Sequence, residues 1–394
     1  MLATAQTALS AAFTADLDAA LGAVGIDVLT IIAEYGPAQL EVTVAPHWGV
    51  ATADAAATLK GAVKEVAAAH GLAATSVTRP FPTAGGAACG GHLNLSLWAG
   101  WGAGDSAGGF NLLHDAAAPA GLSTLSRHLL AGLLAHGHGL SALLAPTVNC
   151  YTGRSGLDGW APATSCWGVD NRSACVRVKP PPAPPPAPAS VAANAGPPAA
   201  GDAAAAAAAT PPLGGGTYIE CRQPSAAASP HVALAAVVAA GADGLRRRLR
   251  HGLPPPVGGS VYDAVRGCGA AAVGGLLPAD LPAALAALAA DRRLTGALGE
   301  PFVRWFMAVK AAELHDWEGG GGGVTAAAGR RGGRGTTRSW RGGCMPRCCD
   351  PRRFSLLSGQ LGHVHSHGWH RWSTHPSRLA QSRAPPPSGW APPG

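Results

Sequence analysis

The sequence lacks any hydrophobic run long enough to cross a bilayer, which takes about 20 consecutive apolar residues. Its richest apolar stretch, Val232 to Gly241, is ten residues long, and Asp243 follows it closely. No Lys or Arg precedes Lys60, so the sequence also lacks the positive start of a secretory signal and the arginines of a transit peptide. We therefore expect a cytoplasmic protein without a membrane partner, with an organelle as the open alternative.

Positive charge is scarce in most of the chain and concentrated at its end. The first 318 residues hold 18 Lys and Arg against 21 Asp and Glu, whereas residues 319–394 hold 11 basic residues and one acid, Asp350. The net charge of +7 at pH 7 therefore belongs to the C-terminal segment. This excludes a basic body that binds nucleic acid, so we expect no nucleic-acid partner.

The nine cysteines lack the regular spacing of a disulfide framework or a zinc site. Six of them are scattered among apolar residues, which predicts small, reduced core side chains. These six are Cys89, Cys150, Cys166, Cys175, Cys221 and Cys268.

The chain has no internal repeat, but its composition divides it. Residues 179–216 contain eleven prolines, which cannot donate the backbone hydrogen bonds of a helix or sheet. This composition predicts an extended or disordered insert between two neighbouring strands. Residues 319–394 open on a run of glycines and continue without hydrophobic periodicity. We predict one domain over 1–318, interrupted by the insert, and a disordered tail over 319–394. A segment that binds single-stranded nucleic acid and a transition-metal site are the alternatives for the tail.

Helices and strands alternate in the ordinary parts of the sequence. The 3.6-residue pattern predicts helices over 54–70, 123–144, 230–249, 281–298 and 301–317. Short runs rich in β-formers predict strands over 28–34, 40–44, 92–98, 174–178 and 217–222. No glycine-rich nucleotide fingerprint joins a strand to a helix, so the pattern favours the α+β class over a doubly wound fold.

Two acids flank the dipeptide Gly36-Pro37, which suits a tight turn. If Pro37 and Ala38 form the tip of a hairpin, Glu34 lies directly opposite Glu41. Two carboxylates about 5 Å apart repel each other and can bind a divalent cation. The alternative is a solvated hairpin with two unrelated surface acids.

Polar and apolar residues alternate in the segment that begins at His92. His92, Asn94 and Ser96 therefore share one face of the predicted strand, and a glycine-rich approach lets the backbone come close to a ligand. This face is a candidate binding surface, and a half-exposed strand is the alternative.

Arginines and one further acid complete the candidate set. Arg154, Arg172 and Arg177 are close in sequence, and arginine clusters bind carboxylates or phosphates. Arg172 and Arg177 are separated by an odd number of positions, so a regular strand needs a bulge to turn both to one side. Glu220 and Arg222 are two positions apart and share a strand face, where an ion pair between them is the alternative to a site.

The order of these motifs resembles the catalytic domain of glutamine synthetase. The acid pair is followed by His-x-Asn-x-Ser, PTVNCY, DNRSACVR, Glu-x-Arg and the alanine-rich helix after SPH. The similarity covers about 20–178 and 217–318, and continues through LGEPFVRWF and KAAELHDWE. Within this family, the sequence resembles the type I and γ-glutamylpolyamine synthetase-like branch. The resemblance implies a curved antiparallel sheet flanked by helices.

The resemblance also implies a reaction. In this family, ATP phosphorylates the γ-carboxylate of glutamate, and ammonia or another amine displaces phosphate to form the amide. The expected cofactors are ATP and Mg²⁺ (or Mn²⁺), and the expected assembly is a homo-oligomer. The matched metal ligands are Glu34 and Glu41 for the first ion and His92 and Glu220 for the second. The other matched positions are Arg154 and Arg222 at glutamate, Arg172 and Arg177 at the phosphates, and Asn94 and Ser96 at the nucleotide.

Two departures from the family pattern bear on the choice of amine and on whether the chain is active. Trp160 occupies the position of the family's catalytic flap carboxylate. The resemblance implies catalytic roles for Trp160 and for Arg172, the arginine at the phosphates. An aromatic face holds an alkylammonium by cation–π attraction, which favours a larger amine. We also expect this sequence to lack the family's small N-terminal β-domain and its strand with two further acidic ligands. Three functions therefore stay open: a ligase for ammonia, a ligase for a larger amine or polyamine, and a catalytically silent truncated homologue.

Overall fold

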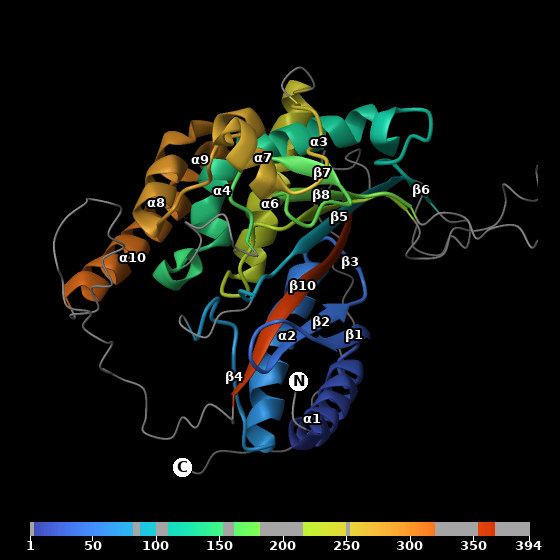
Figure 1. Ribbon diagram of the computed structural model, residues 1–394, viewed down its shortest axis with the longest axis vertical. Coiled ribbons are helices and arrows are strands. Elements are labelled where there is room, and N and C mark those ends of the chain that lie inside the picture. The colour runs from blue at the N-terminus through green and yellow to red at the C-terminus, as the bar shows by residue number, and fades with distance from the viewer. Residues whose placement is uncertain are drawn as a thin grey trace, which may run out of the picture.

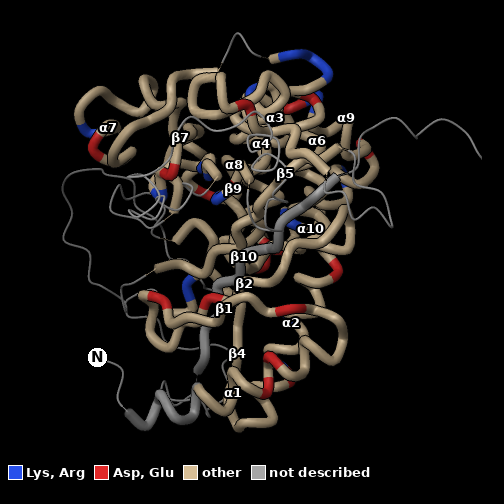
Figure 2. The backbone as a smooth tube through the Cα atoms, turned by 90° about the vertical axis from the view of Figure 1, so that its right-hand side faces the viewer, with Lys and Arg blue, Asp and Glu red and all other residues tan. Residues whose placement is uncertain are grey.

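A computed structural model describes residues 4–81, 87–99, 109–152, 161–181, 216–249 and 253–319, and the backbone of 354–366. A ten-stranded sheet crosses the molecule, with one group of helices at its lower end and a larger group at its upper end (Figures 1 and 2). The strand order is β1-β2-β10-β5-β9-β8-β7, with β3 and β4 paired to β10 and β6 paired to β5. This mixture of helices and sheet confirms the α+β class.

The sheet contains all five strands that the sequence predicts. They are β1 (Val28–Ala33), β2 (Gln39–Val44), β5 (Leu93–Ala99), β8 (Val176–Lys179) and β9 (Tyr218–Cys221). The pairs β1–β2, β5–β9 and β8–β9 are antiparallel, as expected. The shorter strands are β3 (His47–Trp48), β4 (Ala73–Thr75), β6 (Phe110–Asn111) and β7 (Trp167–Val169). The sheet differs from the expected antiparallel one in that β7 runs parallel to β8, and β10 runs parallel to each of its partners.

The strand β10 (Phe354–Ser366) corrects the prediction of a disordered tail over part of its length. It lies between β2 and β5 and pairs with both (Figure 1). Composition misses such a strand because the hydrogen bonds that hold it come from strands more than 250 residues earlier in the chain. The division into a domain, an insert and a tail otherwise stays a prediction.

The insert leaves and returns at one place in the sheet. β8 ends at Lys179, β9 begins at Tyr218, and these two residues face each other in the antiparallel pair. The prediction of an excursion between neighbouring strands is thus confirmed, while residues 182–215 of the insert lie outside the described part of the chain.

One group of helices packs on the β1–β2 end of the sheet. α1 (Thr4–Ala23) and α2 (Ala51–Ala69) enclose a small core with β1 and β2, centred on Phe13, Leu17 and Val42. α2 matches the predicted helix, and Gly71 follows it with a left-handed φ of 66°, a conformation that favours glycine.

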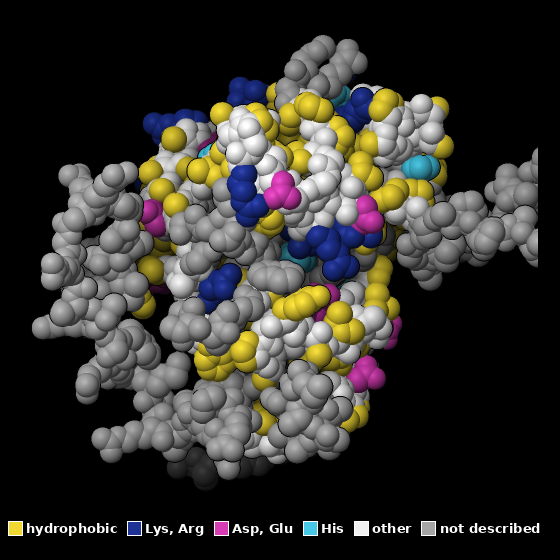
Figure 3. Space-filling model, in the orientation of Figure 1, with side chains coloured by type: hydrophobic (Ala, Val, Ile, Leu, Met, Phe, Trp, Pro, Cys, Tyr) yellow, Lys and Arg dark blue, Asp and Glu magenta, His cyan; other side chains and the backbone are white. Residues whose placement is uncertain are grey.

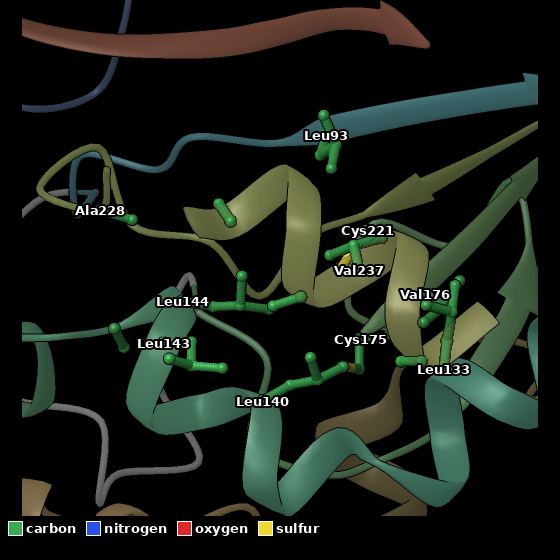
Figure 4. Packing of buried hydrophobic residues seen from close by; sticks show 14 of the residues in the cluster. Leu93, Leu133, Leu140, Leu143, Leu144, Cys175, Val176, Cys221, Ala228 and Val237 are labelled. Carbon is green, nitrogen blue, oxygen red and sulfur yellow. The ribbon is translucent and has the colours of Figure 1, made fainter. Parts of the chain in front are cut away.

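A second group of helices covers the other end of the sheet and forms the main core. It comprises α3 (Thr124–Ala135), α4 (Gly137–Leu144), α6 (Pro230–Arg247), α8 (Leu281–Ala290), α9 (Arg292–Leu298) and α10 (Glu300–Gly319), with α7 (Val261–Cys268) at its margin. Figure 4 shows side chains of α4 and α6 packed against those of β5, β8 and β9, with Cys175 and Cys221 among them. Five of the six predicted core cysteines are buried and reduced, but Cys268 is exposed. No helix in the described ranges is long and apolar enough to cross a membrane.

Two glycines bring α3 and α6 unusually close together. A Cβ atom on Gly132 would come within 2.3 Å of the Ala240 carbonyl oxygen, and one on Gly244 within 2.2 Å of the His128 carbonyl oxygen. Any other residue at either position would push the helices apart, since real Cβ contacts are longer than 3.0 Å.

Two of the predicted helices are broken by a polar cluster in the core. His136 separates α3 from α4, and its ring is hydrogen-bonded to Asp291, 2.6 Å from Nδ1, and to Asp243, 3.0 Å from Nε2. Asp291 in turn caps α9 and separates it from α8. Burial disfavours the charged imidazole, but the hydrogen bonds to Asp291 and Asp243 outweigh it and raise the pKa of His136.

Candidate active site

Glu220 lies at the centre of the candidate site, on the buried strand β9. Pairing places Glu220 opposite Asn94 of β5 on one side and Arg177 of β8 on the other. Its side chain is only 3% exposed, and three groups contact its two oxygens. Arg222 Nη1 donates to Oε1 over 2.8 Å, Arg177 Nη1 donates to Oε2 over 3.2 Å, and His92 Nδ1 lies 3.2 Å from Oε1.

These contacts decide the charge of Glu220. Burial alone raises a carboxyl pKa, but the hydrogen bond with His92 and the charges of Arg222 and Arg177 lower the pKa of Glu220 to about 2. The carboxyl is therefore ionised at neutral pH, and it offsets the charge of two arginines that are themselves nearly buried.

The imidazole of His92 stays neutral at physiological pH. Its pKa is lowered first by burial and then by the positive charges of Arg222 and Arg177, against the opposing effect of Glu220. With Nδ1 directed to Glu220, the second ring nitrogen, Nε2, keeps a lone pair that suits a metal ion. Gly90 permits this position, because a Cβ atom there would lie 3.0 Å from Nε2. The glycine-rich approach thus makes room for the histidine ring.

The hairpin with the acid pair does not have the predicted register. Glu41 lies opposite Ile32, and Glu34, just beyond β1, donates its backbone N–H to the carbonyl of Gln39 over 2.9 Å. The loop is longer than the expected tip, and its last residue, Ala38, has a left-handed φ of 53°. Glu34 and Glu41 are consequently diagonal neighbours on one face, where long side chains still meet.

The two acids nevertheless interact as a pair. The pKa of Glu41 is raised to about 7, first by burial, then by the charge of Glu34 and a hydrogen bond with it, and further by the charge of Glu220. Arg172 acts in the opposite direction. The Glu41 carboxyl is therefore only partly ionised at neutral pH, at a place where negative charge accumulates.

A divalent cation fits the Glu34–Glu41 pair better than the Glu220 position. Carboxylate oxygens are the ligands Mg²⁺ prefers, and a cation there takes the place of a shared proton. Both oxygens of Glu220 already accept hydrogen bonds, so a cation at His92 and Glu220 has to replace one of these contacts. Within the described residues, no three His, Cys, Asp or Glu side chains form a ready metal site.

The remaining predicted residues occupy different depths around this centre. Asn94 and Ser96 are both buried on β5, and Ser96 Oγ accepts a hydrogen bond from Trp98 Nε1 over 2.9 Å. Arg172 is exposed in the turn before β8, outside the strand for which a bulge was expected, and its charge acts on Glu41. Arg154 and Trp160 lie outside the described residues.

A cavity opens beside this centre, and sequence reasoning missed part of its lining. Its wall includes His92 and Arg222, which were predicted, and Arg79, Cys89 and Cys150, which were not. Asn149 explains the position of Arg79, because its amide side chain accepts from the backbone N–H of Arg79 over 2.7 Å and donates to its carbonyl over 2.9 Å. In Figure 3, basic side chains and a histidine gather near the junction of β5 and β10.

Comparison with known proteins gives the family. The family model "Glutamine synthetase, catalytic domain" matches residues 2–189 and 204–320. The chain is 32% identical over 312 residues to glutamine synthetase of Thermus thermophilus, and 32% identical over 321 residues to glutamate–methylamine ligase of Methyloversatilis universalis. Rat lengsin is 30% identical over 298 residues. These matches cover 77%, 78% and 75% of this chain.

Solved structures agree with this result. A structure described as a novel glutamine synthase homologue matches 78% of this chain and 60% of its own, with a TM-score of 0.56 and 29% identity. The chain spans 60%, 61% and 44% of the length of the three curated relatives. The buried Glu-x-Arg strand, the acid pair and the family match together show that the chain belongs to the glutamine synthetase family, through that family's catalytic domain.

Proposed function

We propose that this protein is an ATP-dependent ligase that forms a γ-glutamyl amide from glutamate and an amine, with γ-glutamyl phosphate as intermediate. The observation that carries the proposal is the opposed charge of neighbouring groups. The acids Glu34 and Glu41 lie together close enough to Glu220 for its charge to raise the Glu41 pKa, and Glu220 itself is paired with two arginines. Phosphoryl transfer needs such a combination, because it depends on positioning and on compensating phosphate charge.

Each described residue then has a task. Arg222 borders the cavity and holds a carboxylate of glutamate, while Arg177 and Arg172 hold nucleotide phosphates. Glu220 keeps Arg177 and Arg222 apart at fixed positions, since each donates to a different oxygen. Two Mg²⁺ or Mn²⁺ ions would supply further positive charge for the phosphate oxygens, the first held by Glu34 and Glu41 and the second by His92 and Glu220. Asn94 and Ser96 provide the nucleotide contacts of this proposal.

Ammonia is the amine that the family resemblance implies, and a larger amine is the second candidate. The similarity to glutamate–methylamine ligase supports the second candidate. Trp160 supports it too, because an indole ring attracts an alkylammonium by roughly 0.5–2 kcal/mol and gives ammonium no carboxylate. A homo-oligomer, in which a neighbouring copy completes each site, is part of the same proposal.

Phosphate release by the full chain tests the reaction and the amine together. With ATP, Mg²⁺ and glutamate, we expect release to need glutamate and to rise more with methylamine or a polyamine than with ammonium. Arg222→Met should raise the KM for glutamate, whereas Arg266→Met, on the exposed side of α7, should not. Phosphate release that does not depend on glutamate would contradict the proposed ligase activity. Ammonium as the better acceptor at equal concentration selects the first candidate, and Trp160→Glu should then have little effect.

A further inference from the structure

Asp170 is an acid that the proposed reaction does not use, although it contacts a residue that the reaction needs. It follows β7 directly and has a left-handed φ of 48°, a conformation that Asp tolerates better than most residues. Its backbone N–H donates to the carbonyl of Val178 over 2.9 Å, which fixes the turn against β8. The side chain of Asp170 is thereby directed along the β8 edge of the site.

Two basic side chains converge on a single oxygen of Asp170. Arg177 donates to Oδ1 through Nε over 3.0 Å and through Nη2, and Lys179 Nζ donates to the same atom over 2.8 Å. The side chain of Asp170 is 56% exposed, whereas that of Arg177 is only 11% exposed. The contact thus links a solvent-exposed acid to an arginine that is nearly buried in the site.

Arg177 is held at both ends by these contacts. Its Nε and Nη2 face Asp170, and its Nη1 faces Glu220. A guanidinium has five N–H groups in a rigid plane, so the three donor atoms already engaged leave N–H groups to donate to an incoming anion. Two acids on opposite sides fix the plane of the guanidinium before any ligand binds.

We propose that Asp170 is a positioning residue that fixes the guanidinium of Arg177 in the orientation in which it receives the nucleotide phosphates. The inference rests on the proposed function, since it needs a phosphate at Arg177. A flexible arginine loses rotamer freedom when it binds an anion, and prior fixation removes that loss from the binding step. An ion pair this exposed adds little to the stability of the fold, so its effect falls on binding.

The contact with Lys179 requires Asp170 to be a charged carboxylate and not only a hydrogen-bond acceptor. Lys179 and Arg177 share one carboxylate oxygen, and without it their charges would repel each other. The hydrogen bonds from Lys179 and then Arg177 lower the pKa of Asp170, so the carboxylate is present throughout the physiological range. Neutralising Asp170 therefore frees both cations to move.

The replacement Asp170→Gly tests the proposal without straining the turn, because glycine accepts a positive φ. In the full chain with Mg²⁺, we expect the KM for ATP and the dissociation constant of ADP to rise about tenfold, as for other residues that orient a ligand-binding side chain. The KM for glutamate should change less than twofold, because Arg222 pairs with Glu220 independently of Asp170. Asp170→Asn keeps an acceptor and the turn and should lie between wild type and Asp170→Gly.

Controls separate positioning from a structural role. Asp263→Asn removes the acid of another exposed Asp–Arg pair, with Arg266, and should leave both KM values unchanged. Adding Asp170→Gly to Arg177→Met should weaken nucleotide binding no further than Arg177→Met alone, because the two residues act through one guanidinium.

The possible results have distinct meanings. An unchanged affinity for ADP in Asp170→Gly overturns the positioning role and leaves the ligase intact. An equal rise in both KM values, or a melting temperature many degrees lower, also overturns it and makes Asp170 a structural turn residue. A wild-type chain that binds neither ATP nor ADP overturns the proposed function, and the role of Asp170 with it.

Discussion

Glu41 and Glu220 are the same residue type in two regions of one site, yet their carboxyl groups are shifted in opposite directions. Glu41, in the region of α1, α2 and the β1–β2 hairpin, has its pKa raised to about 7, whereas that of Glu220, in the main core, is lowered to about 2. Both are buried enough for desolvation to raise the pKa. The difference comes from their neighbours: Glu41 has another acid beside it, and Glu220 has His92 and two arginines.

The comparison shows how the two regions divide the chemistry. Residues 1–81 hold seven acids and three basic residues, so this region carries the negative side of the site. The main core supplies Arg177 and Arg222 together with the acid that neutralises them. In the proposed reaction, a cation would bind in the first region and an anion would bind the arginines of the second.

The largest expected effect comes from neutralising Glu220. Glu220→Gln leaves the nearly buried Arg222 without its carboxylate partner and leaves Arg177 with Asp170 alone, which should lower the free energy of unfolding by about 3–5 kcal/mol. Urea denaturation followed by circular dichroism measures this loss. Glu65→Gln, on the exposed side of α2, is the matched control and should change the stability by less than about 0.5 kcal/mol. A loss below 1 kcal/mol for Glu220→Gln would contradict the central role of this acid.

The same substitution at Glu41 should act with the opposite sign. A carboxyl whose pKa is raised in the folded state takes up a proton more readily than in the unfolded state, so stability falls as the pH rises from 4.5 towards and through 7. Glu41→Gln removes this loss and should stabilise the metal-free chain at pH 8 by about 1 kcal/mol, once solvent screening is considered. Thermal unfolding at pH 5.5 and 8 provides the measurement.

Magnesium sharpens this second prediction. In the wild type, Mg²⁺ competes with the shared proton and should raise the melting temperature more at pH 8 than at pH 5.5. In Glu41→Gln, this increase should be largely lost at both pH values. A wild type that Mg²⁺ stabilises equally at the two pH values would show that the acid pair is not the cation site.

The smallest effect is expected for the insert, which belongs to neither region. Replacing residues 182–215 by about eight Gly and Ser residues shortens the loop by roughly two doublings, which stabilises the fold by about 1 kcal/mol at most. Because Lys179 and Tyr218 face each other across β8 and β9, a short loop closes without moving Arg177 or Glu220. A melting temperature several degrees below that of the wild type would show that the insert packs on the domain.

Particular elements show how far the sequence predicts the fold. The helix over 54–70 and the strand around Glu220 were placed correctly, since their apolar spacing reflects local burial. The helix predicted over 123–144 breaks at His136 because Asp243 and Asp291, distant in sequence, draw the imidazole between them. β10 was missed for the same kind of reason.

The residues of the site follow the same rule. The motif order identified Glu34, Glu41, His92 and Glu220. The longer hairpin loop, with Ala38 at a left-handed φ, and the raised Glu41 pKa, caused first by burial and then by Glu34, appear only in the structure. Asp170 stands next to the Asn-Arg dipeptide of a quoted motif, so the signal was present. Its task was hidden because the partners Arg177 and Lys179 meet it only through the pairing of β7 with β8.

The sequence by itself determined the fold class, the family resemblance and the types of residue in the site, because periodicity and motif order are local properties of the chain. Only the tertiary structure decided which of these residues share a proton, a charge or a cavity. A pKa depends on burial and on neighbours brought together across the sheet, as the opposite shifts of Glu41 and Glu220 show. Residues of one type thus receive different chemistry from the strands that pack beside them.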